Sequence, residues 1–155
     1  MQTIFIGIDP GKTGGIACID AETGFASTAP FSSVELIKLC SDNHRSIRCI
    51  CCLEKVGARP NQGVTSMFNF GQNVGYIKGV LESFGIPYQE ITPQKWKSEF
   101  GLNSDKAASA EVCRKLFPNV SLLASERSKK PHDGMAEALL MAEYARRKFG
   151  SGEGK

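Results

Sequence analysis

The N-terminal part of the chain consists of short apolar segments separated by turns rich in glycine. Residues 3–8 form the first segment, residues 14–19 the second and residues 24–28 the third. Apolar, β-branched runs of this length between Gly and Pro residues are typical of β-strands, and the glycine-rich turn between the first two indicates a hairpin. Three consecutive strands are therefore predicted before residue 30.

Longer helical segments follow these strands. Ser33 is suited to the N-cap of the first helix, and Pro93 to the first turn of a short helix that Trp96 and Phe100 anchor. The predicted helices cover residues 33–40, 64–84, a short segment from Pro93, 105–117 and 133–149, and two more strands cover residues 47–53 and 86–91. This order of elements predicts an α/β, RNase H-like fold with a five-stranded mixed sheet flanked by helices. A fold class alone does not define the chemistry.

The composition is that of one folded domain. The chain has 155 residues, of which 41% are hydrophobic and 23% charged, and this is enough to bury one sizeable core. We expect a single RNase H-like domain over residues 1–149. The Gly/Ser/Lys-rich tail at residues 150–155 is predicted to be disordered.

The net charge excludes few classes of function. A formal net charge of +3 and a pI near 8.5 permit nucleic acid binding without requiring it. The sequence contains no run of about 18 apolar residues, and the first strand begins too close to Met1 for a signal or transit peptide. We therefore expect a soluble, cytosolic protein that does not enter membranes.

The six cysteines do not have the paired spacing of zinc ligands. Cys49, Cys51 and Cys52 share one predicted strand, and the other three stand alone in the sequence. We expect reduced thiols that are mostly buried and behave as small hydrophobic side chains.

Two acidic residues stand at the ends of predicted strands. Asp9 follows the first strand in the segment Gly7-Ile8-Asp9-Pro10-Gly11, and Glu54 follows the strand at 47–53. A buried carboxylate at such a position is costly unless it is paired or bound to a metal. The alternatives are an Asp that stabilises a Pro-Gly turn and a Glu that faces solvent.

A second pair of acids stands at the start of the last predicted helix. Asp133 and Glu137 are four residues apart and therefore share one helix face, which continues through Leu140 and Tyr144 toward the core. The alternative is a pair of acids that stabilises the positive end of the helix dipole. Together with Asp9 and Glu54, these two acids would supply only oxygen ligands, which suits two Mg²⁺ ions, and Mn²⁺ is expected to substitute.

Five short segments between about residues 3 and 148 stand out together. They are Gly7-Ile8-Asp9-Pro10-Gly11, Leu53-Glu54, Asn69-Phe70-Gly71-Gln72, Pro93-x-x-Trp96-Lys97 and Ala136-Glu137-Ala138-Leu139-Leu140. As a set they resemble one known family, the RuvC-type Holliday junction resolvases. The four-residue spacing of the last two acids is more similar to the phage and chloroplast branches than to the bacterial enzymes.

The resemblance implies a set of functional residues. The implied catalytic and metal-binding tetrad is Asp9, Glu54, Asp133 and Glu137. His132 is a neighbour that some relatives use, but the spacing to Glu137 favours Asp133. Lys97 and Lys106 match lysines that support junction binding and catalysis in bacterial relatives, although an isolated lysine is more often a solvated charge.

The sequence also departs from the family. Bacterial relatives carry a base-contacting aromatic residue soon after the strand-end Glu, whereas this chain has Lys55-Val56-Gly57 there. Phe68 and Phe70 are the substitutes that we expect to stack on an unpaired base, and ordinary helix packing is the alternative.

Three glycines recur every four residues on the helix at 64–84, namely Gly71, Gly75 and Gly79. Family members dimerise partly through the equivalent helix, so these residues are candidates for the contact between two copies. Close packing of the helix on its own sheet explains them equally well.

The resemblance implies an endonuclease that resolves four-way DNA junctions by two symmetric Mg²⁺-dependent cuts. It would act as a homodimer, in the cytoplasm at the nucleoid or in the host cytoplasm if the gene belongs to a phage. The alternatives are a broader nuclease for flaps and forks and a junction-binding protein without catalysis. An actin-like or sugar-kinase ATPase would need two such domains, and this chain supplies one.

Overall fold

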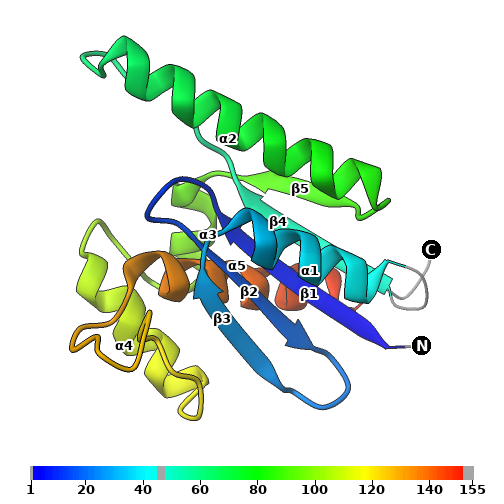
Figure 1. The fold of residues 1–155 in the computed structure, drawn as a ribbon. Helices are drawn as coiled ribbons and strands as arrows, with labels where there is room; N and C mark the ends of the chain where they lie inside the picture. The colour runs from blue at the N-terminus through cyan, green and yellow to red at the C-terminus, as the bar shows by residue number, and fades with distance from the viewer. Residues whose placement is uncertain (1, 45–47, 152–155) are drawn as a thin grey trace.

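The computed structural model describes residues 2–44 and 48–151, apart from the side chain of Lys106. Within these residues five strands form one sheet in the order β3-β2-β1-β4-β5, and helices cover both of its faces (Figure 1). The elements are β1 (Thr3–Asp9), β2 (Gly15–Asp20), β3 (Ala26–Pro30), α1 (Ser33–Asn43), β4 (Arg48–Glu54), α2 (Val64–Ser83), β5 (Tyr88–Ile91), α3 (Pro93–Glu99), α4 (Lys106–Leu116) and α5 (Asp133–Phe149).

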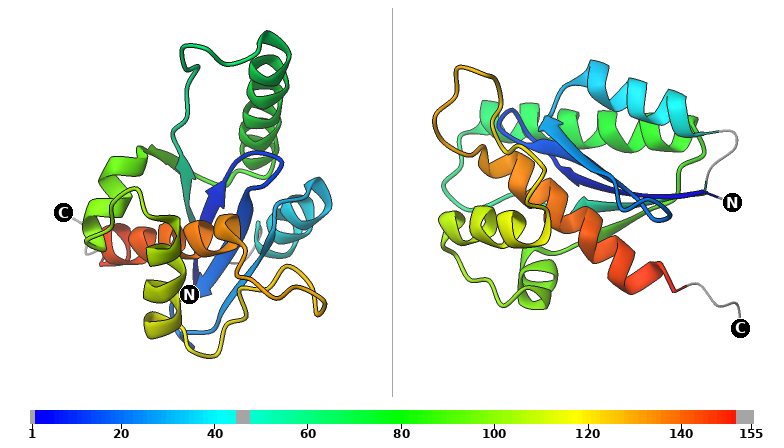
Figure 2. Two further views of the ribbon diagram at one scale, coloured as in Figure 1. Left: turned by 90° about the vertical axis from the view of Figure 1, so that its left-hand side faces the viewer. Right: turned by 90° about the horizontal axis from the view of Figure 1, so that it is seen from below.

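The sheet is mixed. β1 pairs antiparallel with β2, and β2 pairs antiparallel with β3, while β4 lies parallel to both β1 and β5. α1 and α2 pack on one face, and α5 lies on the other together with α3 and α4 (Figure 2). The predicted five-stranded mixed sheet flanked by helices is confirmed.

Most element boundaries agree with the sequence pattern, and the differences have local causes. The N-cap of α1 is Ser32 rather than Ser33, because the Ser32 hydroxyl accepts a hydrogen bond from the Glu35 amide at 3.1 Å. β5 begins after Pro87, which has no amide hydrogen to donate to a neighbouring strand. β3 begins two residues later than predicted, because Gly24 still belongs to the turn, with φ of 72°.

Two predictions fall partly outside the described residues. Residue 47 was expected to start the fourth strand, and β4 is described from Arg48 onward. Of the tail predicted to be disordered, residues 152–155 are not described, while Gly150 caps the end of α5. The disordered tail stays a prediction.

The central strand β1 presents different side chains to its two faces. Ile4, Ile6 and Ile8 pack among residues of α1 and α2, and Phe5 packs on the α5 side. Gly7 also faces α5, since a Cβ there would collide with the backbone of that helix. Because side chains alternate along a strand, the next position on the α5 side is Asp9.

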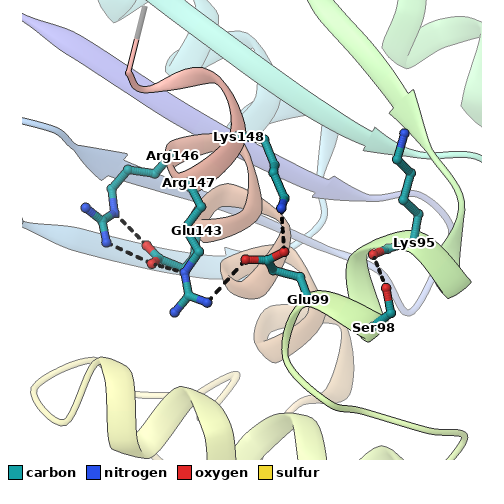
Figure 3. A network of polar contacts seen from close by, with 7 residues as sticks. All are labelled: Lys95, Ser98, Glu99, Glu143, Arg146, Arg147 and Lys148. Carbon is teal, nitrogen blue, oxygen red and sulfur yellow. Dashed lines mark hydrogen bonds and ion pairs between the residues drawn. The ribbon is translucent and has the colours of Figure 1, made fainter.

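Ion pairs fasten α3 to the end of α5. The carboxylate of Glu99 on α3 contacts Lys148 at 2.7 Å and Arg147 at 3.6 Å (Figure 3). Arg147 and Arg146 also donate hydrogen bonds to Glu143, a buried carboxylate that is only 2% exposed. This network links α3 to the C-terminal end of α5.

The cysteine prediction is confirmed. All six cysteines have free thiols, five are buried and Cys18 is partly buried. Among the described residues, no helix is both long and apolar enough to span a membrane.

Candidate metal centre

The strand register places Asp9 and Glu54 side by side. Ile8 of β1 is the partner of Leu53 in the parallel strand β4, so the residues that follow them lie at adjacent carboxyl ends. The side chain of Glu54 points to the same face of the sheet as that of Cys52, which packs on the α5 side. Both carboxylates therefore project toward α5 from neighbouring strand ends.

Helix α5 brings a third carboxylate to the same place. The helix begins directly against the β1–β2 turn, because Gly134 lacks the Cβ that would collide with Thr13 and Gly14. Glu137, one turn further along, is thereby held beside the strand ends. Asp9, Glu54 and Glu137 each offer an oxygen within 4.8 Å of the others, and all three are partly buried.

The electrostatic surroundings of Glu54 disfavour its charged form. Burial raises the pKa of its carboxyl, a hydrogen bond from Trp96 partly offsets this increase, and the charge of Glu137 adds to it. The positive charges of Lys97 and Arg59 lower the pKa of Glu54. The pKa of Glu54 remains above its ordinary value.

The hydrogen bond from Trp96 is a feature that the sequence did not predict. The indole Nε1 donates to Oε2 of Glu54 at 3.0 Å, and the Trp96 side chain is completely buried. The two residues are 42 positions apart, and their contact depends on how α3 packs on the sheet. Sequence reasoning recognised Trp96 only as an anchor of α3.

Asp133 and His132 stand at the entrance of α5. Asp133 lies in the first turn and is exposed, and it is not part of the three-carboxylate group. The three-carboxylate group therefore includes Glu137 without Asp133, and the role of Asp133 as a fourth ligand stays a prediction. His132 is the N-cap, and its Nδ1 accepts a hydrogen bond from the Met135 amide at 3.1 Å.

A groove runs beside Glu54, between the β4–α2 connection and α3. It consists of two adjoining hollows of about 400 and 430 Å³, which share Arg59, Pro93 and Gln94. The first is also lined by Lys55 and the second by Lys97. The groove therefore carries positive charge next to the acidic cluster.

Arg59 was not singled out in the sequence. The only available signal was a basic residue five positions after the strand-end Glu. Lys97, which was predicted, lies partly buried with its Nζ 5.5 Å from the centre of the Trp96 ring. Lys106 is the first residue of α4, and its side chain lies outside the described part of the chain.

The two predicted aromatic residues of α2 have different surroundings. Phe70 is partly buried, packs against Gly11 in the β1–β2 turn and lines the first hollow of the groove. Phe68 is 66% exposed. Phe70 is thus the one that lines the groove, and Phe68 is available to another molecule.

The glycines of α2 do not pack on the sheet. A Cβ at Gly71, Gly75 or Gly79 would meet no described atom within 4 Å. The explanation that they allow close packing on the protein's own sheet is therefore wrong, and this helix face is open.

The three clustered carboxylates fit a hard divalent cation. They offer oxygen atoms only, which is the ligand type that Mg²⁺ and Mn²⁺ favour over nitrogen and sulfur. Their mutual proximity is unfavourable for three negative charges, and a cation between them would relieve it. The donor set and its geometry thus agree with the metal site that the sequence predicted.

Comparison with known proteins supports the fold. No protein-family model matches the chain, and no curated protein matches it in sequence. The structure of T. thermophilus RuvC in complex with a Holliday junction substrate is similar at a TM-score of 0.61 and 13% identity, over 94% of this chain and 95% of that one. Another structure of Thermus thermophilus RuvC gives a TM-score of 0.54 and 19% identity, over 93% and 96%. The resemblance indicated by the sequence motifs is confirmed for the fold: this chain has the RNase H-like fold of RuvC.

Proposed function

We propose that this chain is a metal-dependent endonuclease that cuts branched DNA, with the four-way junction as its main substrate. The observation that carries this proposal is the group of three carboxylates, Asp9, Glu54 and Glu137, at the carboxyl ends of the central strands. The similar fold of a RuvC that was solved with a Holliday junction substrate supports the choice of DNA. The four-residue spacing from Asp133 to Glu137 supports the proposal that the chain is nearer to the phage and chloroplast branches than to the bacterial enzymes.

The carboxylates would hold two Mg²⁺ ions, for which Mn²⁺ would substitute. Such a pair of ions activates water and stabilises the leaving oxygen of a phosphodiester. Asp9 and Glu54 would supply ligands from the rigid strand ends, and Glu137 from the packed part of α5. Asp133 would complete the set from the exposed first turn.

Positive and aromatic residues around the cluster would hold the DNA. Lys97 and Arg59 line the groove beside Glu54 and would contact phosphates, and Lys106 at the start of α4 would do the same. Phe70 in the groove and Phe68 on the open face of α2 would stack on bases that are unpaired at the crossover.

The active unit would be a homodimer. A four-way junction has near two-fold symmetry, so a two-fold dimer can present one acidic cluster to each of two opposed strands. The open glycine face of α2, with Phe68 near its start, is the contact that we propose. Gly75→Leu should then produce monomers and uncouple the two cuts, which sedimentation and a supercoiled cruciform plasmid would reveal. A wild-type monomer that yields only nicked circles would exclude the dimer.

The deciding experiment is a cleavage assay with Mg²⁺ on a four-way junction, a Y-fork, a flap and a linear duplex, with mapping of the products. We expect symmetric cuts in the junction and little cutting of the duplex. Faster cutting of forks or flaps would make the protein a broader branched-DNA nuclease. Tight junction binding without any cutting would make it a non-catalytic binding protein. Because its substrate would be DNA, the protein would act in the cytoplasm at the nucleoid, or in the host cytoplasm if a phage encodes it.

A further inference from the structure

Within the described part of the chain, the indole N–H of Trp96 donates to a residue of the carboxylate cluster. The side chain is completely buried, and its Nε1 lies 3.0 Å from Oε2 of Glu54. An indole N–H is a donor only and stays uncharged at ordinary pH, so it does not bind a cation. It therefore occupies one acceptor position of the Glu54 carboxylate and leaves the remaining lone pairs for other partners.

The helix that carries the donor, α3, is linked to neighbouring elements at both of its ends. At the start, the Thr92 hydroxyl caps the helix, and the Lys55 amide donates to the Ile91 carbonyl at 2.8 Å, which joins β5 to the end of β4. At the end, Glu99 forms its ion pairs with α5, as Figure 3 shows. α3 is thus tied to the strand that carries Glu54 and to the helix that carries Glu137.

We propose that Trp96 is a positioning residue of the metal centre: its buried N–H fixes the orientation of the Glu54 carboxylate toward Asp9 and Glu137. This inference rests on the metal site of the proposed function. Partners that hydrogen-bond to metal ligands set their orientation, and the loss of such a partner typically weakens metal affinity by about 10- to 100-fold. Without the N–H, the Glu54 side chain is able to rotate away from the cation.

The competing explanation is that Trp96 only fills the core and that Glu54 happens to accept its N–H. A variant that keeps an aromatic ring and loses the N–H separates the two roles, and Trp96→Phe is that variant. Phe5→Leu is the matched control, because Phe5 belongs to the same hydrophobic cluster but lies against Gly150 at the far end of α5.

The first test is isothermal calorimetry of Mn²⁺ binding to the wild type and to both variants, without DNA. We expect Trp96→Phe to weaken binding by about 10-fold or more and Phe5→Leu to leave it within about twofold. Equal affinity of Trp96→Phe and the wild type would overturn the inference and leave the metal site intact. Equal weakening in both variants would also overturn it, since the effect would then be a general loss of packing. Absence of binding to the wild type would overturn the proposed function itself.

The second test needs no variant of Trp96, and it holds even if Trp96→Phe does not fold. Trp96 is the only tryptophan of the chain, so the fluorescence of the full protein reports on this one indole. We expect a saturable change in emission when Mg²⁺ is added to the wild type, and no change in Asp9→Asn over the same concentrations. Binding seen by calorimetry without any change in Trp96 emission would contradict the inference.

Discussion

The two ends of α5 carry carboxylates in opposite surroundings. At the N-terminal end, Glu137 meets the carboxylates of Asp9 and Glu54, and burial together with the charge of Glu137 raises the pKa of Glu54. At the C-terminal end, burial also raises the pKa of Glu143, but hydrogen bonds from Arg146 and Arg147 outweigh it and leave this pKa below its ordinary value.

The difference distinguishes acidic residues that stabilise the fold from acidic residues that form the candidate metal site. Glu143 is already neutralised by the protein's own cations, and Glu99 likewise has a lowered pKa because Lys148 donates to it. At the N-terminal end, three carboxylates of the same charge lie close together instead. Their repulsion lowers the stability of the fold until a cation binds between them. Function should therefore depend on one end of the helix and stability on the other.

The largest expected effect is the loss of cleavage when the cluster loses charge. We expect Asp9→Asn, Glu54→Gln and Glu137→Gln each to slow junction cleavage by about 100-fold or more, because even the partner of a metal ligand contributes about 10- to 100-fold. Binding to the junction should persist, since each substitution removes the charge of a metal ligand and no positive side chain that would contact a phosphate. Single-turnover cleavage and gel-shift assays measure both, with exposed Glu111→Gln as control. Wild-type rates in any of the three would contradict the two-ion assignment.

The same cleavage assay, applied to Asp133→Asn, tests whether Asp133 is a fourth metal ligand. It is exposed and stands apart from the three-carboxylate group, yet we expect Asp133→Asn to lose at least about 10-fold in rate as well. Unchanged cleavage would reduce the site to three carboxylates.

The sequence predicted the parts of the site that depend on local geometry. Asp9 and Glu54 were identified because each ends a predicted strand, where a buried carboxylate is costly unless it is paired or bound to a metal. The observed register places these two strand ends side by side. The bounds of α5 were predicted because its apolar spacing is long and regular. These features follow from chain periodicity alone.

The features that were missed depend on tertiary packing. The contact of Trp96 with Glu54 requires that α3 pack against β4, and no spacing rule encodes this. The exposure of Asp133 depends on where α5 meets the β1–β2 turn, and that contact is made by the next residue, Gly134. Helical spacing shows which residues share a face, but not where the neighbouring sheet ends.

Glu143→Gln should lower the stability of the fold and leave cleavage unchanged, in contrast to the cluster variants. Removing the charge weakens its hydrogen bonds with Arg146 and Arg147, at a cost of about 2 kcal/mol in the free energy of unfolding. For a chain of this size the melting temperature would fall by roughly 2–4 °C per kcal/mol. Thermal unfolding measures this, and cleavage well below the transition should be unchanged. A loss of cleavage at full stability would contradict the division between the two ends.

The pH dependence of stability should also differ in sign. Glu143 has a lowered pKa, so its contribution is present at neutral pH and disappears as the pH falls through that pKa. Glu54 has a raised pKa, so in metal-free protein stability falls as the pH rises from the ordinary carboxyl value through the raised one. Urea unfolding in EDTA should find Glu54→Gln more stable than the wild type at neutral pH, with the difference vanishing in acid. A less stable variant at neutral pH would refute this.

The smallest expected effects belong to the groove. Lys97→Ala and Arg59→Ala should each weaken junction binding and reduce the slope of log affinity against log salt by about 0.9 for every duplex phosphate that the side chain neutralises. Exposed Lys115→Ala, on α4, is the control. An unchanged slope for either groove variant would make that residue an ordinary surface charge.

The central claim, that the N-terminal end of α5 forms a divalent metal site, is tested most directly by the melting temperature in a titration with Mg²⁺. A cation that binds only the folded state adds about 2.7 kcal/mol at 100 times its Kd, so the melting temperature of the wild type should rise by roughly 5–10 °C. Glu143→Gln should start lower and rise by the same amount, whereas Glu54→Gln should not respond. Equal responses of all three proteins, or no response of the wild type, would contradict the account.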